Sequence, residues 1–234
     1  MRRWLMFALL LLLFTQARRV CAGEVIDRIA ATVNTAAILE SDVEEAARYE
    51  ALLDGRPARP LNAAARRVTL ERLIDQELLR QQIGANTPGP AAAEIAERMN
   101  QLRQQAGQTG EAWKVALGRY GLSEDEVRER LQLQLRIGRY IEQRLRPGIH
   151  VDDASVEEYY RTQLLPELRK SGVENAPALR QVRQQIEEIL VQQRMGEELN
   201  GWLRSLREQS RVRLAADLAP APSPEDEKPP RGGK

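Results

Sequence analysis

The feature that most constrains the fold is a long amphipathic stretch from about residue 177 to residue 209. Its apolar residues recur at helical spacing and form two successive stripes. At 1.5 Å per residue such a helix would be roughly 45–50 Å long, which is more than a compact domain of this length requires. The helix must therefore bridge parts of the fold or project from it. The two stripes consist of Leu179, Val182, Ile186, Ile189 and Leu190, followed by Met195, Leu199, Trp202, Leu203 and Leu206.

The remaining chain predicts shorter helices and little sheet. Gly and Pro residues separate the predicted helices, several of which begin at a capping residue. The third of them, at about residues 91–105, has few apolar residues and is predicted to be an exposed arm. The first predicted helix begins at Ser41, which forms a capping box with Glu44, and the next two cover about residues 62–83 and 91–105. A short fourth helix contains Trp113 to Tyr120. The fifth runs from the Ser123–Glu126 capping box to Leu145, and the sixth begins at Asp152.

Two short strands precede these helices, and one follows them. Residues 25–33 contain β-branched residues with a partial period of two, Asn34-Thr35 is a turn candidate, and residues 37–39 can return as a second strand. Residues 212–214 can form the last strand. An isolated hairpin is marginally stable, so it must pack on helices or recruit another strand. The predicted fold class is therefore mostly α with a small β-hairpin.

Composition excludes several kinds of reactive site. The chain of 234 residues contains one Cys and one His, which excludes a disulfide scaffold and a Cys/His zinc site and argues against Ser–His–Asp or Cys–His catalysis. The formal net charge of +1 gives no bulk electrostatic reason to bind nucleic acid. No Gly-rich phosphate loop followed by Lys and Ser or Thr is present. His150 with Asp152 and Asp153 could bind a metal, but a helix cap is the preferred interpretation.

The N-terminus has the pattern of a secretory signal peptide. Arg2 and Arg3 precede an apolar run from Leu5 to Phe14, and cleavage is predicted after Ala22. The run has about ten residues, whereas a membrane span needs roughly twenty; an uncleaved anchor remains the alternative. We predict a signal peptide at residues 1–22, a folded core at 23–214, and a disordered tail rich in Pro, Gly and charge at 215–234. Removal of the signal also removes the single Cys, as suits an oxidising compartment.

Five segments in order resemble the SurA-type periplasmic chaperones, which belong with the PrsA-like and trigger-factor-like secretion chaperones. The resemblance implies a multi-helix chaperone core in which the strand near Val212 completes the N-terminal hairpin and the last helix packs back on the N-terminal helices. It also implies a periplasmic location. The segments are EVIDRIAATVNTAAILESDV, LERLIDQELLRQQI, GRYGLSEDEVRERLQLQLRIGRYIEQRL, HVDDASVEEYY and LRQVRQQIEEILVQQRMGEELNGWLRSLREQSRVRL.

The chain also departs from this family. Its members usually carry one or two parvulin-type prolyl isomerase domains between the helix ending in two Tyr residues and the closing helix. Here 15 residues separate Tyr160 from Ala176, and a folded domain needs roughly fifty or more. The resemblance therefore implies a chaperone without an isomerase domain, which is not an enzyme. A Gly common in the hairpin turn of the family is replaced here by Asn34-Thr35-Ala36, which leaves the turn geometry open.

The implied function is that of an ATP-independent holdase that binds unfolded outer-membrane or secreted proteins in an apolar groove between helices. It requires no cofactor or metal and no nucleic acid. The alternative is an envelope scaffold, or a membrane-tethered interaction protein, that binds one folded partner. The candidate groove residues are large side chains on helices with broad apolar arcs, although ordinary core packing explains each of them as well. They are Tyr49, Leu52, Trp113, Tyr120, Leu133, Ile137, Tyr140 and Trp202.

Overall fold

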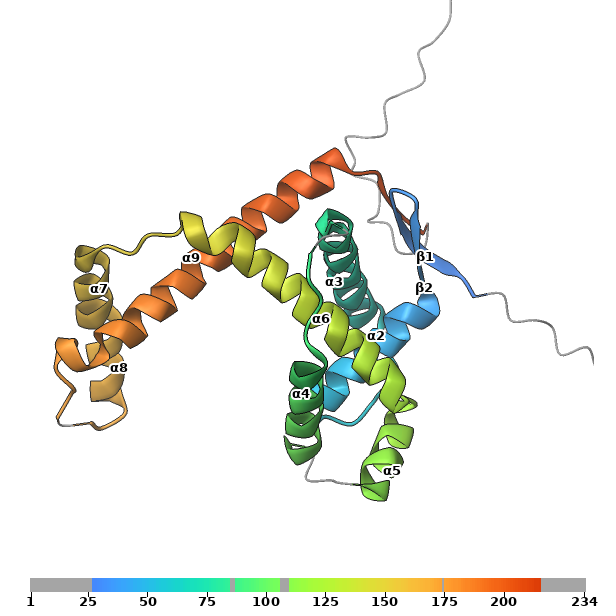
Figure 1. Ribbon diagram of the computed structural model, residues 1–234, viewed down its shortest axis with the longest axis horizontal. Helices are drawn as coiled ribbons and strands as arrows, with labels where there is room; N and C mark the ends of the chain where they lie inside the picture. The colour runs from blue at the N-terminus through green and yellow to red at the C-terminus, as the bar shows by residue number, and fades with distance from the viewer. Residues whose placement is uncertain (1–26, 85–86, 106–109, 174, 216–234) are drawn as a thin grey trace, which may run out of the picture.

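The computed structural model describes residues 27–84, 87–105, 110–173 and 175–215. The predicted signal peptide and nearly all of the predicted tail lie outside these residues, so both stay predictions. The mostly α fold class is confirmed (Figure 1). The elements are β1 (Ile29–Val33), β2 (Ala36–Leu39), α2 (Glu40–Leu53), α3 (Ala63–Gln82), α4 (Ala92–Gln105), α5 (Glu111–Tyr120), α6 (Glu124–Leu145), the 3-10 turn η2 (Arg146–Gly148), α7 (Asp153–Tyr159), the π-helical turn η3 (Tyr160–Leu164), α8 (Leu165–Lys170), α9 (Leu179–Gln209) and β3 (Val212–Leu214).

The three strands form one antiparallel sheet in the order β2-β1-β3. Val33 pairs with Ala36 across the hairpin and with Val212 on the other side, so the C-terminal strand completes the N-terminal hairpin as the family resemblance implied. Asn34 makes the turn without the family's Gly because Asn tolerates its φ of +57°. The Asn34 amide oxygen also accepts a hydrogen bond from the Arg211 N–H at 2.9 Å, which ties the turn to β3.

The first hydrophobic cluster lies between the sheet, α3, α6 and the C-terminal half of α9. Val33 and Ile74 are fully buried in it, and Leu206 of α9 packs against the same group. Beside this cluster the Arg207 guanidinium donates to Asp75 at 2.7 Å and to Glu71 at 2.6 Å, both on α3. The last helix therefore packs back on an N-terminal helix, as expected from the resemblance.

The second hydrophobic cluster joins α2, α4, α5 and α6. It is centred on Tyr49, Met99, Trp113 and Val127, all of which are buried. Met99 belongs to α4 and is 2% exposed, so the prediction that this helix is an exposed arm is wrong. One large apolar side chain, supported by Ile95 and Leu102 from the same helix, is enough to anchor an otherwise polar helix.

Most of the predicted helix starts are confirmed, but one is wrong. Asn62, Ser123 and Asp152 each accept a hydrogen bond from a backbone N–H three residues later. The helix α2 instead begins at Glu40, and Asp42 accepts the N–H of Leu39 at 2.8 Å. Ser41 lies within the first turn, and its hydroxyl donates to Asp27. The carboxylate of Asp42, one residue after the predicted cap Ser41, forms the capping hydrogen bond instead, and the helix therefore begins earlier than predicted.

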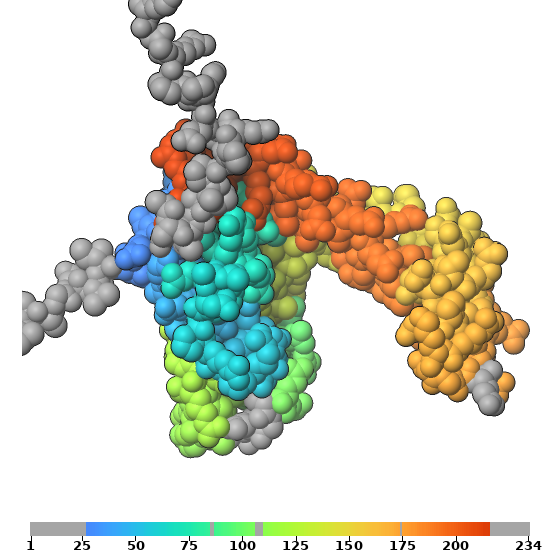
Figure 2. Space-filling view, turned by 180° about the vertical axis from the view of Figure 1, so that it is seen from behind, coloured from blue at the N-terminus to red at the C-terminus, as the bar shows by residue number. Residues whose placement is uncertain are grey.

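The helix α9 both bridges and projects, as its predicted length requires. Its 31 residues correspond to roughly 46 Å at 1.5 Å per residue. We call the sheet, α2–α6 and the C-terminal half of α9 the body, and α7, η3, α8 and the N-terminal half of α9 the arm. Figures 1 and 2 show the arm standing apart from the body, with α9 and the end of α6 as the connection and open space between the two parts.

Candidate functional site

The structure divides the eight predicted groove residues between two places. Four belong to the second cluster, around the end of α2 and around α5. The other four lie along α6 and α9, beside the first cluster. The first group consists of Tyr49, Leu52, Trp113 and Tyr120, and the second of Leu133, Ile137, Tyr140 and Trp202.

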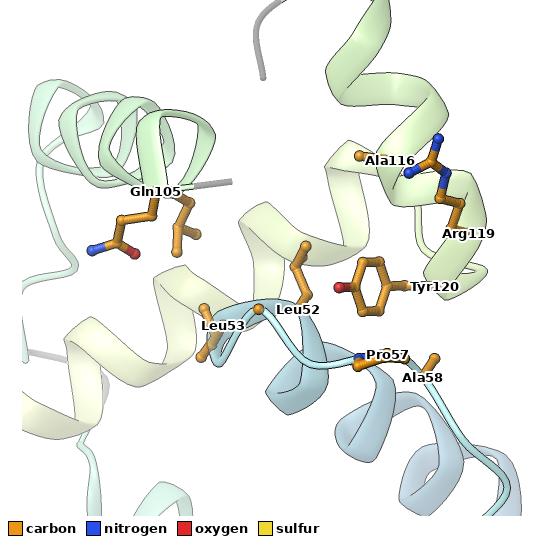
Figure 3. A pocket seen from close by; sticks show the side chains of 10 residues that line it. Leu52, Leu53, Pro57, Ala58, Gln105, Ala116, Arg119 and Tyr120 are labelled. Atoms are coloured by element: carbon orange, nitrogen blue, oxygen red, sulfur yellow. The ribbon is translucent and has the colours of Figure 1, made fainter. Parts of the chain in front are cut away.

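An apolar pocket of about 540 Å³ opens where the second cluster reaches the surface. Leu52 and Tyr120 are the predicted residues that line it. In Figure 3 the Tyr120 ring lies beside Leu52 and the segment that carries Pro57 and Ala58, and Gln105 of α4 lies on the opposite side of the pocket. The complete lining consists of Leu52, Leu53, Gly55, Pro57, Ala58, Leu102, Gln105, Ala116, Arg119 and Tyr120, and we call this site the apolar pocket.

The local sequence explains why the pocket is concave. The helix α2 stops at Leu53, and Gly55 adopts a φ of +62°, which turns the chain back beneath the helix end. The Arg56 N–H donates to the Ala51 carbonyl at 2.8 Å and fixes this return. The helix α5 ends at Tyr120, and the next residue, Gly121, also adopts a φ of +62°, so that this turn sets the direction in which α6 leaves. Two helix ends and a Pro-containing loop therefore frame the pocket.

The side chains around the pocket suit a mainly apolar ligand. Leu53 is 37% exposed although it is large and apolar, so it presents apolar surface to water at the pocket. Gln105 and Arg119 are the polar members of the lining. The site contains no carboxylate, histidine or cysteine among its lining residues, so it offers apolar contact and a few hydrogen bonds but no acid–base pair.

Tyr49 and Trp113 belong to the second cluster together with Leu52 and Tyr120. They are 2% and 1% exposed, and neither lines the pocket. The Tyr49 hydroxyl donates a hydrogen bond to the Gln134 side-chain oxygen at 3.0 Å. Burial raises the pKa of Tyr49, against the opposing effect of the Arg130 and Arg98 charges. In this structure both aromatic rings act as core residues.

The second group of predicted residues gathers where α6 crosses α9. The rings of Tyr140 and Trp202 have centroids 5.9 Å apart, and the Arg144 guanidinium lies 4.8 Å from the centre of the Trp202 ring. These three side chains form an aromatic and cation–π contact at the root of the arm. Ile137 is buried in the first cluster, and Leu133 packs against that cluster. The crossing therefore serves to join α6 to α9.

Sequence reasoning missed most of the pocket. Leu53, Pro57, Ala58 and Arg119 line it, but they carry no periodic signal because they sit at helix ends and in a loop. The one local signal was the Gly and Pro pattern after α2, which predicts a break without showing what it faces. The metal alternative at His150 finds no support, since Asp152 caps α7 and Asp153 pairs with Arg183 at 2.6 Å.

The geometry thus defines a mostly helical protein with an apolar surface pocket and a projecting arm. Over 138 residues the chain is 30% identical to the chaperone SurA of Pseudomonas aeruginosa. That alignment covers 57% of the chain and 33% of the relative, so the chain spans about a third of the length of the curated relative it matches. The predicted resemblance to the SurA-type chaperones is confirmed.

A solved structure from a study of the virulence factor PEB4 and the periplasmic protein Cj1289, two SurA-like chaperones of Campylobacter jejuni, is also similar. The TM-score is 0.49 and the identity 12%, over 81% of this chain and 100% of that chain. No protein-family model matches the chain. Among the residues that the structure describes, no helix has an apolar stretch long enough to span a membrane.

Proposed function

We propose that the protein is an ATP-independent periplasmic holdase that binds unfolded outer-membrane or secreted polypeptides. The observation that carries the proposal is the apolar pocket of about 540 Å³ in a chain that is similar to SurA. A cavity of this size accommodates one or two large apolar side chains, which an unfolded chain exposes in number. Binding of this kind is driven by burial of apolar surface and needs no nucleotide.

The two-part shape supports the same function. The arm and the body leave open space between them (Figure 2), so an unfolded segment could lie against both. Part of the arm is held by single polar contacts, such as the one that Tyr160 donates to the Pro177 carbonyl at 2.7 Å. An arm held by few buried contacts can adjust its position to a client segment at low free-energy cost.

We further propose that the protein lacks prolyl isomerase activity and is exported by residues 1–22. Between α7 and α9 the described chain forms η3 and α8, where family members carry isomerase domains. A proline-isomerisation assay should show no acceleration over the uncatalysed rate, and measurable acceleration would contradict this part of the proposal. Sequencing the N-terminus of the exported protein should find cleavage after Ala22, and an intact N-terminus would favour a membrane-tethered protein.

The holdase proposal is tested by aggregation of an unfolded outer-membrane protein at several-fold molar excess of the exported chain, without ATP. We expect wild type to slow aggregation. Leu53→Lys should weaken this effect, because a cation in the apolar pocket opposes burial of the client. Val68→Lys is the matched control, because Val68 is 58% exposed on α3 and does not line the apolar pocket. No suppression by wild type, or equal activity of both variants, would contradict the proposal.

A further inference from the structure

A second concavity, lined by α3, α6, β2 and the start of α2, differs chemically from the apolar pocket. Its volume is about 350 Å³. Its lining combines four apolar residues, which we call its floor, with five carboxylates, which we call its rim. We call it the acidic cup. Its floor consists of Ala37, Ile38, Leu73 and Leu133, and its carboxylates are Asp42, Glu45, Glu77, Glu126 and Glu129, against a single lining cation, Arg130.

Two of the five carboxylates are already neutralised by Arg residues. Glu45 pairs with Arg130 at 2.7 Å, and Glu77 pairs with Arg80 at 2.5 Å. The Gln81 amide also donates to Glu77 at 2.7 Å. Burial alone would raise the pKa of Glu77, but these hydrogen bonds outweigh it and lower that pKa. Both ion pairs are therefore structural, and they leave three acids uncompensated.

The other three acids keep the cup negative. Asp42 and Glu126 each use one carboxylate oxygen to accept a backbone N–H at a helix start, from Leu39 at 2.8 Å and from Ser123 at 2.6 Å. These hydrogen bonds hold both carboxylates in place. The Ser123 contacts also lower the pKa of Glu126. Glu129 is exposed and forms no ion pair or hydrogen bond with another described residue.

One cation outside the cup also acts on its rim. Arg48 contributes with Arg130 to the lowered pKa of Glu126, but the ion pair that Arg48 forms is with Glu44 at 3.7 Å. Arg48 therefore does not neutralise the rim, whose net charge stays negative. Apolar surface beside carboxylates strengthens their attraction for a cation relative to that in water alone.

We propose that the acidic cup binds a Lys or Arg side chain of an extended, unfolded client segment. The aliphatic stem of such a side chain fits the apolar floor while its charged end meets the free carboxylates. The inference rests on the proposed holdase function and adds a class of client residue to it. It makes the protein a binder of two kinds of side chain, apolar in the apolar pocket and cationic in the acidic cup.

Two observations favour a polypeptide over a free cation. The described residues contain no group of three or more carboxylate, His or Cys side chains suited to hold a metal ion. In addition, Ala37 and Ile38 belong to β2, which is an edge strand of the sheet. An edge strand can hydrogen-bond an extended backbone laid beside it. The edge strand β2 can therefore bind the backbone of an extended peptide while the acidic cup beside it binds one of the peptide's side chains.

The test measures binding of three labelled peptides to the full chain by fluorescence anisotropy. The peptides share their apolar residues and differ at one position, which is Lys, Gln or Glu. We expect the Lys peptide to bind roughly fivefold more tightly than the Gln peptide at low salt, with the preference reduced at high salt. The Glu peptide should bind most weakly. Equal affinity of the Lys and Gln peptides would overturn the inference.

Glu129→Lys is the discriminating variant, because it reverses the one rim charge that has no structural role. It should abolish the preference for Lys. Glu157→Lys makes the same change at an exposed position of the arm and should leave the preference intact. A preference unchanged by Glu129→Lys would place the cation elsewhere and overturn the assignment. If spermidine at the same concentration as the Lys peptide displaced that peptide, the proposed specificity for a polypeptide would be overturned.

The aggregation assay separates this inference from the proposed function. If wild type prefers the Lys peptide but does not slow aggregation, the holdase function fails and the cationic site stands. If wild type slows aggregation but binds the Lys and Gln peptides equally, the holdase function stands and the acidic cup fails.

Discussion

The body and the arm are stabilised by different kinds of contact. The body contains two hydrophobic clusters, with Val33, Ile74 and Val127 fully buried. In the described part of the arm, Val156 and Ile186 are the buried residues, and η3 and α8 contribute none. The apolar area removed from water, which dominates folding stability, is therefore concentrated in the body.

The arm is held instead by Arg side chains. Arg183 of α9 pairs with Asp153 of α7 at 2.6 Å, and Arg194 donates to the Ser155 hydroxyl at 3.2 Å and to the His150 carbonyl. Exposed ion pairs contribute little stability, typically about 0–1 kcal/mol each. Regions with few buried contacts open locally at low free-energy cost. We therefore predict that the arm opens locally at a lower free-energy cost than the body.

The largest effect is expected in the body. Ile74 is fully buried in the first cluster, and Ile74→Ala removes apolar contacts and leaves a cavity. We expect the free energy of unfolding to fall by about 2–5 kcal/mol, measured by urea denaturation. Ile189→Ala is a control, because Ile189 is 41% exposed on α9. This variant should lose far less free energy of unfolding. Similar losses at the two positions would show that the first cluster does not dominate stability.

A smaller and local effect is expected in the arm. Val156 of α7 is fully buried, and α7 packs against α9. Val156→Ala removes about two methylene equivalents and should lower the stability of the arm by roughly 1–2 kcal/mol. If the arm opens independently, hydrogen exchange of α7 and α8 amides should accelerate while that of α3 and α6 stays unchanged. A uniform acceleration through α3 and α6 would show that the body and the arm unfold together.

The body was more predictable from sequence than the details of its surface. The two predicted stripes of α9 contain its two buried residues, Ile186 and Leu206, because apolar periodicity indicates which side of a helix leaves water. The first of these stripes wrongly included Ile189, which is 41% exposed. Met99 shows the limit: α4 looked exposed because one buried side chain does not make a stripe. Ser41 shows another limit, since the neighbouring Asp42 competes for the same cap and only geometry decides between them.

The candidate site was predicted in part, for a physical reason. Leu52 and Tyr120 were found because they sit on apolar helix faces, and both line the apolar pocket. Tyr49 and Trp113 have the same pattern but lie in the core, since periodicity separates buried faces from exposed ones and cannot separate core from pocket wall. The acidic cup was not predicted, because its carboxylates come from three helices and meet only after folding.

The smallest effect concerns the cap of the arm. Hydrogen bonds from Ser155, together with the charge of Arg194, lower the pKa of Asp152 below its ordinary value. The capping contribution of Asp152 is therefore complete above the unfolded pKa of about 3.9 and is lost as pH falls through the lower folded value. Hydrogen exchange of α7 amides, corrected for intrinsic rates, should accelerate on acidification below pH ~3.9.

Asp152→Asn separates this titration from general acid unfolding. Asn caps helices about as well as Asp but carries no charge, so the variant should keep α7 protected near neutral pH and remove the part of the acid response that Asp152 causes. Exchange in α3 should be the same in both proteins, because Asp152 touches the arm alone. If Asp152→Asn leaves the acid response of α7 unchanged, the arm opens in acid because other ion pairs are lost, such as that of Arg183 with Asp153. Protonation of Asp152 would then make no separate contribution to the opening.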